Sequence, residues 1–481
     1  MARTARVSSL LVDAEAAATP DGLGAAIVGE IAVGRLGVGD PLPSSRALAG
    51  DLGVARSLVV TTYDALAAAG IITVAAGSGA AVAVTADVAA ASLGVGTAPQ
   101  HQREPLQPRL VRPQRIPPAR LRFNLSPGAP DVTLIREADW RQAWRAASQT
   151  VPDLDWYHPM QHPELEQALV THLRRTRGIP VEQREVIIFP GVSAAIQAIV
   201  HALEPQRVAM EDPGYPLARI PLQQNVARVD LIPVDAGGLC VDALSAQDLA
   251  YVTPAHQFPL GGRLSAVRRE QLLRWADRED AVIVEDDFDG EYRHDATPLG
   301  PLRSMSGGAD RVAYIGTASK ILTPHLRLAW AVVPGWMADA VRVAGGALRL
   351  DASRVASMAL AQMISSGNLS RHLARAQRTY AARRRRLVDA LHASLPHVEV
   401  LGVEAGIHVA VRWEDSSVSD VDAVEELAAR GIVVAALSEY AVSHPVNGLL
   451  LGYAQLPETG AQAAVHEIAD ALKGVGLAPN S

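Results

Sequence analysis

Short apolar strands alternate with helical stretches through most of this chain, and this alternation constrains its fold more than any other feature. From Phe123 onward, the runs EVIIFP, RVAMEDP, AYVTP, AVIVEDD and RVAYIG are separated by stretches with helical spacing of apolar residues. Strands that are apolar on both sides need cover on both faces, and helical connections bring successive strands back in parallel. The sequence therefore predicts an α/β fold with a mainly parallel central sheet between helices.

The chain of 481 residues is long enough for more than one core, and its composition changes along its length. Residues 10–86 have their own helical spacing and form a first domain. Residues 87–120 are rich in proline, glutamine and arginine without apolar periodicity, which predicts a flexible linker. Residues 121–481 hold the alternation, and we expect a large part at about 150–335 and a small C-terminal part at about 345–478.

Several observations restrict where the protein works. Residues 65–86 carry no charge over about the length of a membrane span, but glycines interrupt the run, so a helix end followed by a hairpin is the better prediction. The single cysteine, Cys240, excludes an internal disulfide, and acidic residues stand where a signal peptide needs its apolar run. We therefore expect a cytoplasmic protein with no membrane contact. No group of histidines, cysteines or acids has metal-ligand spacing, so no metal is expected.

Lys320 stands out because Lys320 and Lys473 are the only two lysines among 44 lysines and arginines. Arginine does not lose its proton in proteins, whereas a neutral lysine amine can condense with an aldehyde. In the same domain, acids end the apolar strand VIVEDD, at the sheet edge where α/β folds bind ligands. A carboxylate there could keep a pyridine nitrogen protonated.

Groups that suit a phosphate occur in the same domain. The helix of GVSAAIQ begins directly after the strand of VIIFP, so its first backbone amides are free to bind an anion. The candidate phosphate donors are Ser193, Ala194, Thr317, Ser319 and Arg327. An aldehyde-reactive amine, an acid for the ring nitrogen and a phosphate cradle are what pyridoxal 5'-phosphate requires, so this cofactor is the leading prediction.

The first domain has the element order of a winged helix-turn-helix. SSRALAGDLG predicts a helix that Ser44 caps, VARSLVVTTYDALAAAG predicts a second helix that Gly70 ends, and IITV and AVAV flank the turn AAGSGA as a two-stranded wing. The line from LPSS to GAAV resembles the GntR family of bacterial regulators. That resemblance implies a recognition helix near residues 55–69 in the major groove of double-stranded DNA. The DNA contacts that it implies are Ser44, Ser45, Arg46, Arg56, Ser57, Gly77, Ser78 and Gly79.

Two departures from the GntR pattern affect the expected affinity for DNA. Ala55 stands where the family usually has serine, so a helix cap is missing. Residues 1–86 hold five arginines against seven acids, so one copy of this domain neutralises few phosphates. We therefore expect a homodimer that binds an operator with paired half-sites.

The rest of the chain carries a second resemblance. The order GVSAAIQ, MEDPGYP, VTPAHQFPLGG, VEDDFDGEYR and GTASKILTPHLRLAW resembles the fold-type I aminotransferases, and most closely the MocR regulators, which join a GntR-like winged helix-turn-helix to an aminotransferase-like body. The resemblance covers about residues 20–475. It implies that Lys320 is the Schiff-base lysine and that Asp286 pairs with the ring nitrogen, with Asp287 as the alternative one position away.

The MocR resemblance also assigns aromatic residues. It implies that Tyr215 stacks on the cofactor ring and that Tyr157 reaches the phosphate of a neighbouring subunit, while ordinary packing is the alternative for both. Phe288 stands beside the cofactor where relatives have a tyrosine hydroxyl, and Phe258 stands where aminotransferases often have an asparagine. In NGLLLGYAQL, Leu450 replaces the arginine with which aminotransferases hold the substrate carboxylate. Without that bidentate pair, efficient transamination is not expected.

Three hypotheses for the function stay open. The leading one is a transcriptional regulator with pyridoxal phosphate itself as effector, controlling vitamin B6 metabolism. The alternatives are a regulator that senses an amino acid attached to the cofactor, and a working aminotransferase with a vestigial head. Two further predictions are that Arg383–Arg386 form a solvated helix face, with contact to DNA or the linker as the alternative, and that His256 either forms a hydrogen bond near the cofactor or supports its own loop.

Overall fold

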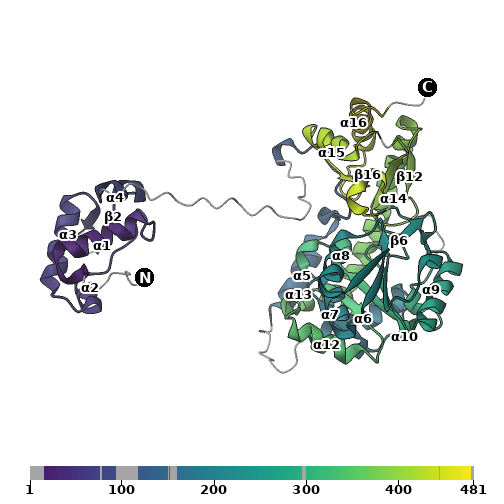
Figure 1. The fold of residues 1–481 in the computed structure, drawn as a ribbon, viewed down its shortest axis with the longest axis horizontal. Coiled ribbons are helices and arrows are strands. Elements are labelled where there is room, and N and C mark those ends of the chain that lie inside the picture. The colour runs from purple at the N-terminus through teal and green to yellow at the C-terminus, as the bar shows by residue number, and fades with distance from the viewer. Residues whose placement is uncertain are drawn as a thin grey trace. The chain divides into compact units, whose positions relative to one another are not determined.

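The computed structural model describes residues 16–75, 79–93, 118–149, 151, 160–294, 299–415, 417–443 and 445–477. The chain divides into two compact units, Met1–Arg112 and Pro113–Ser481, here called the head and the body (Figure 1). The predicted site residues Tyr157, Gly77 and Ser78 lie outside the described residues, as does the greater part of the predicted linker.

The head packs helices and a two-stranded wing around one core. Thr19 caps the first helix with its side chain, and Tyr63 donates a hydrogen bond of 2.8 Å from its hydroxyl to the Pro43 carbonyl, which joins the third helix to the segment just before the second. The predicted hairpin is confirmed, because Ile72 pairs with Val82 in an antiparallel ladder. No described helix of the chain is both long and apolar enough for a membrane crossing. The elements are α1 (Pro20–Ala32), α2 (Ser45–Leu52), α3 (Arg56–Ala68), β1 (Ile72–Ala75) and β2 (Gly79–Val82).

The head extends further than the sequence suggested. We expected a linker from residue 87, but Ala86–Ser92 form helix α4, which packs against α1 through the fully buried Ala89. Alanine has a high helix propensity, but this segment is too short to show an amphipathic pattern. Its composition therefore resembles that of a linker.

The body is built on an eight-stranded sheet in the order β4-β11-β10-β9-β8-β5-β6-β7. The pairs from β10 through β6 are parallel, whereas β11 runs antiparallel to both of its neighbours and β7 runs antiparallel to β6. The five predicted runs are β4, β5, β8, β9 and β10, so the α/β prediction is confirmed. The bounds are β4 (Val186–Phe189), β5 (Arg207–Asp212), β6 (Arg228–Asp235), β7 (Gly238–Leu239), β8 (Leu249–Val252), β9 (Val282–Asp286), β10 (Val312–Thr317) and β11 (Ala329–Val332).

Helices cover both faces of this sheet (Figure 1). In β9, Val282 and Val284 lie in one apolar cluster with α7, α8 and α12, whereas Ile283 lies in another with α9. Successive strand residues therefore point to opposite faces, which decides the roles of the acids that follow. The helices are α5 (Glu137–Ala147), α6 (Pro163–Thr176), α7 (Val192–Leu203), α8 (Pro216–Asn225), α9 (Ala266–Arg278), α12 (Ala338–Ala347) and α13 (Arg354–Ser365).

A smaller antiparallel sheet forms the C-terminal part of the body, with the order β12-β13-β16-β15. The predicted strand in GIHVAVRW is β13, and the closing helix is α16. The bounds are α14 (Asn368–Ser394), β12 (Glu399–Leu401), β13 (His408–Trp413), α15 (Asp420–Ala429), β15 (Ala435–Ala436), β16 (Asn447–Gly452) and α16 (Ala461–Gly474).

The arginine run of α14 is only half solvated, so the expectation of one solvated face was wrong for two of its members. Arg383 pairs with Asp131 at 2.7 Å, and the buried Arg384 donates to the Val403 carbonyl. Arg385 and Arg386 are exposed as predicted. A helix turns by about 100° per residue, so four consecutive arginines cannot share one face.

Candidate functional site

Lys320 lies in the short helix α11 (Ala318–Ile321), directly after the carboxyl end of β10. The side chain is partly buried, and its amine donates a hydrogen bond of 2.9 Å to the Gly128 carbonyl. A Cβ at residue 128 would lie 2.3 Å from this Nζ, so glycine leaves the room that the amine occupies. Burial lowers the pKa of Lys320, against the opposing effect of Asp289 and Asp286. A lowered pKa increases the share of neutral, nucleophilic amine at a given pH.

Asp286 ends the neighbouring strand β9, where the Tyr251 hydroxyl donates a hydrogen bond of 2.6 Å to Oδ2. Its other oxygen, Oδ1, is buried and has no hydrogen-bond partner among the described residues. Burial raises the pKa of Asp286 to about 7, while the bond from Tyr251 acts in the opposite direction. The carboxylate is therefore within electrostatic reach of Lys320 and retains an acceptor for one further N–H group.

Asp287 has a different environment on the opposite face of the sheet. Arg177 forms an ion pair with Asp287 Oδ2, and Tyr314 donates to the same oxygen at 2.7 Å. Asp287 Oδ1 is also buried without a partner among the described residues, but Asp287 Oδ2 accepts two side-chain hydrogen bonds whereas Asp286 accepts one. An adjacent guanidinium balances Asp287, whereas Asp286 has a phenol and, further away, the Lys320 amine.

The start of α7 and Arg327 form the positive end of the site. Gly191 caps α7 with a φ of +142°, and a Cβ on it would lie 3.3 Å from Nη2 of Arg327. Free backbone amides at a helix start and a guanidinium together suit a phosphate. Arg327 has a φ of +51°, a left-handed conformation that few residues other than glycine adopt.

The other predicted phosphate donors are used differently. The Ser193 hydroxyl donates to the Leu217 carbonyl at 3.1 Å, and Ala194 is half-buried one position later. Thr317 caps the helix of Lys320, because its hydroxyl accepts from the Ser319 amide at 3.1 Å and donates to the Leu328 carbonyl at 3.3 Å. The structure therefore brings Arg327 to the start of α7, while the Thr317 hydroxyl is occupied in holding α11.

Tyr215 connects the two charged ends of the site. It caps α8, and burial raises its pKa to about 12, with Asp286 adding to the increase and Arg327 opposing it. Tyr215 therefore lies within electrostatic reach of both charges. Its ring meets Phe258 edge to face at a centroid distance of 5.5 Å.

Apolar side chains occupy the remaining side of the site. Phe258 contacts Phe288 edge to face at 5.6 Å and Tyr440 at 5.2 Å. Leu450 is fully buried in a cluster with Leu260, against which Phe258 packs. Leu450 therefore lies among apolar side chains, whereas Phe258 and Phe288 contact apolar and aromatic groups together with the His408 ring.

Sequence reasoning missed several residues of the site. Tyr251, Arg177 and Tyr314 hold the two acids, and none of them lies within a motif that pointed to the cofactor. His256, whose role was open, forms a hydrogen bond of 3.0 Å between its Nδ1 and Oδ2 of Asp289. A side chain that acts across neighbouring strands leaves no local spacing signal; for Tyr251 the only clue was its place near the end of an apolar strand.

The predicted DNA contacts of the head lie at the starts of α2 and α3. Arg46, Arg56 and Ser57 are exposed, and Arg56 Nε is 3.5 Å from the Ser45 hydroxyl. Ser44 caps α2 by accepting from the Ala47 amide at 3.2 Å. Ala55 begins α3 without a side-chain cap, as its sequence implied, and Gly79 is exposed at the start of β2.

Comparison with protein families divides the chain in the same way. Residues 21–82 match the bacterial regulatory proteins of the gntR family, and residues 123–468 match aminotransferase class I and II. Among solved structures, the body is similar to an archaeal alanine:glyoxylate aminotransferase, with a TM-score of 0.68, 23% identity and coverage of 73% of this chain and 91% of that chain. At this identity the similarity establishes the fold.

Whole-chain relatives combine both parts. The HTH-type pyridoxine biosynthesis transcriptional regulator PdxR of Corynebacterium glutamicum is 34% identical over 92% of this chain and 93% of its own. The probable rhizopine catabolism regulatory protein MocR of Rhizobium meliloti is 33% identical over 89% of each chain. The chain thus belongs to the MocR-type regulators of the GntR family, transcriptional regulators with a GntR helix-turn-helix head and an aminotransferase-like body.

Proposed function

We propose that this regulator binds pyridoxal phosphate in its body, that the cofactor is itself the effector, and that the protein controls vitamin B6 metabolism. The observation that carries the proposal is a buried Lys320 amine within electrostatic reach of Asp286, whose buried Oδ1 has no partner among the described residues. The similarity over most of both chains to a regulator of pyridoxine biosynthesis supports the regulated process.

The residues of the site fit this cofactor. Asp286 would accept from the protonated ring nitrogen, Tyr215 would lie against the ring, and Arg327 with the first amides of α7 would hold the phosphate. When bound, the cofactor supplies an aldehyde and an absorbing aromatic ring. Lys320 supplies the amine for that aldehyde, and Thr317 and Ser319 fix the helix that carries it. Phe288 contributes apolar contact in place of a hydroxyl.

The apolar surroundings of Phe258 and Leu450 favour the cofactor alone over an amino acid as effector. A substrate carboxylate placed there would lose its hydration without gaining a charge-assisted partner. The free-energy cost would be on the order of several kcal/mol, similar to that of breaking a buried ion pair. Steady turnover of an amino donor and a keto acid would establish the enzyme instead. A spectral response to amines would establish an amine sensor.

Regulation requires communication with DNA, and we propose a homodimer in the cytoplasm that places two heads on paired operator half-sites. The exposed arginines at the starts of α2 and α3 support contact with phosphates and guanine edges. Cofactor binding would shift the equilibrium between two arrangements of the dimer.

A double titration tests the proposal. Pyridoxal phosphate is added to the purified full chain while near-ultraviolet and visible absorbance and binding to its own upstream DNA are followed. We expect a new absorbance band that saturates and a change in operator affinity over the same concentration range. If neither signal responds, the proposed effector is wrong.

A second experiment tests the head. Replacement of Arg56 by alanine should weaken operator binding and reduce the slope of log affinity against log salt by about 0.9 for each head that contacts a phosphate through this residue. Arg141→Ala in α5, which also removes one exposed arginine, is the control. An unchanged salt slope for Arg56→Ala would place the DNA contact elsewhere.

A further inference from the structure

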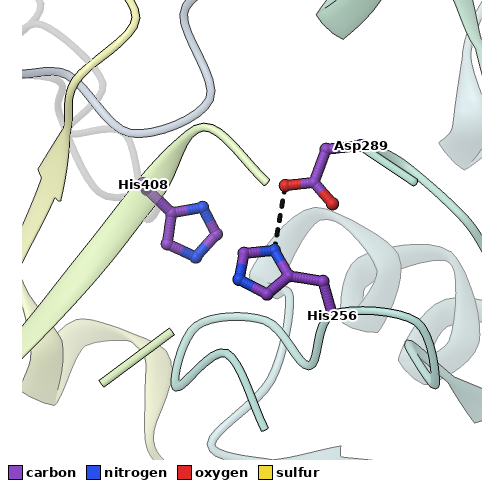
Figure 2. A group of neighbouring side chains, drawn as sticks. All are labelled: His256, Asp289 and His408. Atoms are coloured by element: carbon purple, nitrogen blue, oxygen red, sulfur yellow. Dashed lines mark hydrogen bonds and ion pairs between the residues drawn. The ribbon is translucent and has the colours of Figure 1, made fainter. Parts of the chain in front are cut away.

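Two histidines and an aspartate meet in the interior of the body beside Lys320. His256 comes from the loop between β8 and α9, Asp289 from the loop after β9, and His408 from β13 of the small sheet (Figure 2). All three are buried, and one potential ligand atom from each lies within 4.8 Å of the others. The three side chains, here called the His–Asp–His trio, therefore join both sheets of the body.

The geometry of the trio is close to that of a metal site. Nδ1 of His256 and Oδ2 of Asp289 are 3.0 Å apart, and the two imidazole rings have a centroid distance of 4.7 Å. Two ligand atoms of a tetrahedral zinc ion are roughly 3.3 Å apart, because each lies about 2.0–2.1 Å from the metal. The first pair already has this separation, and the His408 nitrogen has to approach by at most about 1.5 Å.

Buried nitrogen atoms without partners are the second, independent observation. Among the described residues, Nε2 of His256 and both ring nitrogens of His408 form no hydrogen bond. Burial lowers the pKa of His408 well below its usual value, His256 adds to this effect, and the Pro259 carbonyl opposes it. A metal-bound histidine commonly directs its second nitrogen to such a carbonyl. Unsatisfied buried polar atoms are rare, and a missing ion is one of the standard explanations.

The backbone around the trio is fitted to it. A Cβ on Gly406, which has a φ of +79°, would lie 2.3 Å from Oδ2 of Asp289 and from two atoms of the His256 ring. Only glycine allows the chain to pass so close to both ligands. Apolar rings close another side, because Phe288 stacks on His256 at 5.9 Å and on His408 at 6.3 Å.

We propose that His256, Asp289 and His408 bind a divalent transition metal of the zinc class through two imidazole nitrogens and one carboxylate oxygen. The contact between His256 Nδ1 and Asp289 Oδ2 gives way to bonds from both atoms to the ion. The ion ties β13 of the small sheet to two loops of the large sheet. None of the three residues is among those proposed to hold pyridoxal phosphate, although Asp289 acts electrostatically on Lys320 and Phe288 contacts both imidazoles.

The test uses the full chain without a histidine tag. After incubation with Zn²⁺ and dialysis, we expect about one zinc per chain, and with Co²⁺ the visible bands of a four-coordinate ion. Asp289→Asn and His408→Phe should each lose most of the bound metal, whereas His466→Ala, which removes an exposed histidine of α16, should retain it. Metal should also raise the melting temperature of the unmodified chain and leave that of His408→Phe unchanged.

Two results would overturn the proposal. One is the absence of stoichiometric zinc and of cobalt bands in the unmodified chain, a result that no folding defect of a variant can affect. The other is equal metal retention by the unmodified chain and by folded Asp289→Asn and His408→Phe, since the ion then lies elsewhere. Circular dichroism of the metal-free variants establishes that they are folded.

Discussion

Replacement of Lys320 by alanine is expected to abolish the absorbance change on addition of pyridoxal phosphate and to make operator binding insensitive to it at concentrations that saturate the unmodified chain. The reason is that no other described side chain presents an amine beside Asp286. Arg327 and Tyr215 would still hold the phosphate and ring, so weak noncovalent binding would remain. We expect affinity to fall by roughly 100-fold or more, equivalent to about 2.7 kcal/mol.

The second lysine of the chain provides a matched control. Lys473 is exposed in α16, so Lys473→Ala should leave the absorbance change and the DNA response intact. Because the chain has only these two lysines, reduction of the complex with borohydride followed by peptide mass spectrometry should find the label on residue 320. Label on Lys473, or an unchanged spectrum in Lys320→Ala, would refute the assigned role.

The largest expected effect on stability comes from the ion pair beneath the site. Arg177 and Asp287 are both buried, and Arg177 also donates a hydrogen bond of 2.6 Å to the Gly290 carbonyl. Arg177→Met leaves the Asp287 carboxylate in the interior without its counter-charge. A broken buried pair of this kind lowers the free energy of unfolding by about 3–5 kcal/mol. Denaturant unfolding of the full chain measures the loss.

Two further variants make this measurement specific. Arg386→Met removes an exposed arginine that pairs with Glu458, and it should change the free energy of unfolding by no more than about 1 kcal/mol. Arg177→Met combined with Asp287→Asn removes both charges but keeps an acceptor for Tyr314, so it should recover much of the loss. If Arg177→Met is no more destabilising than Arg386→Met, the pair does not stabilise the body.

The elements that sequence predicted well are those whose signal is local. The five apolar strands and the wing follow from runs of neighbouring residues. In the five strands, an uninterrupted apolar run indicates that both faces are buried. Helix α4 was not predicted, because an alanine-rich segment with few larger apolar residues resembles a linker in sequence. The burial of Arg383 and Arg384 was not predicted, because a run of charged residues gives no information about the carbonyls and acids of distant segments that contact it.

The site shows the same division. Lys320, Arg327 and Tyr215 stand in motifs, and the structure brings them near Asp286 or the start of α7. The choice between Asp286 and Asp287 depended on which face of β9 each occupies, and a one-residue shift exchanges the faces. Arg177 lies more than a hundred residues from Asp287, and His408 reaches Asp289 from another sheet, so no spacing could have indicated either pairing.

The apolar packing of Phe258 and Leu450 has a consequence for how the proposed sensor would behave over time. In a catalytic pocket, the occupancy depends on the rate of substrate turnover, because each cycle converts the bound substrate and releases the product. A pocket lined so that no amino acid is held simply fills and drains. Its occupancy then follows the free cofactor concentration in the cell by mass action, and binding does not consume the cofactor.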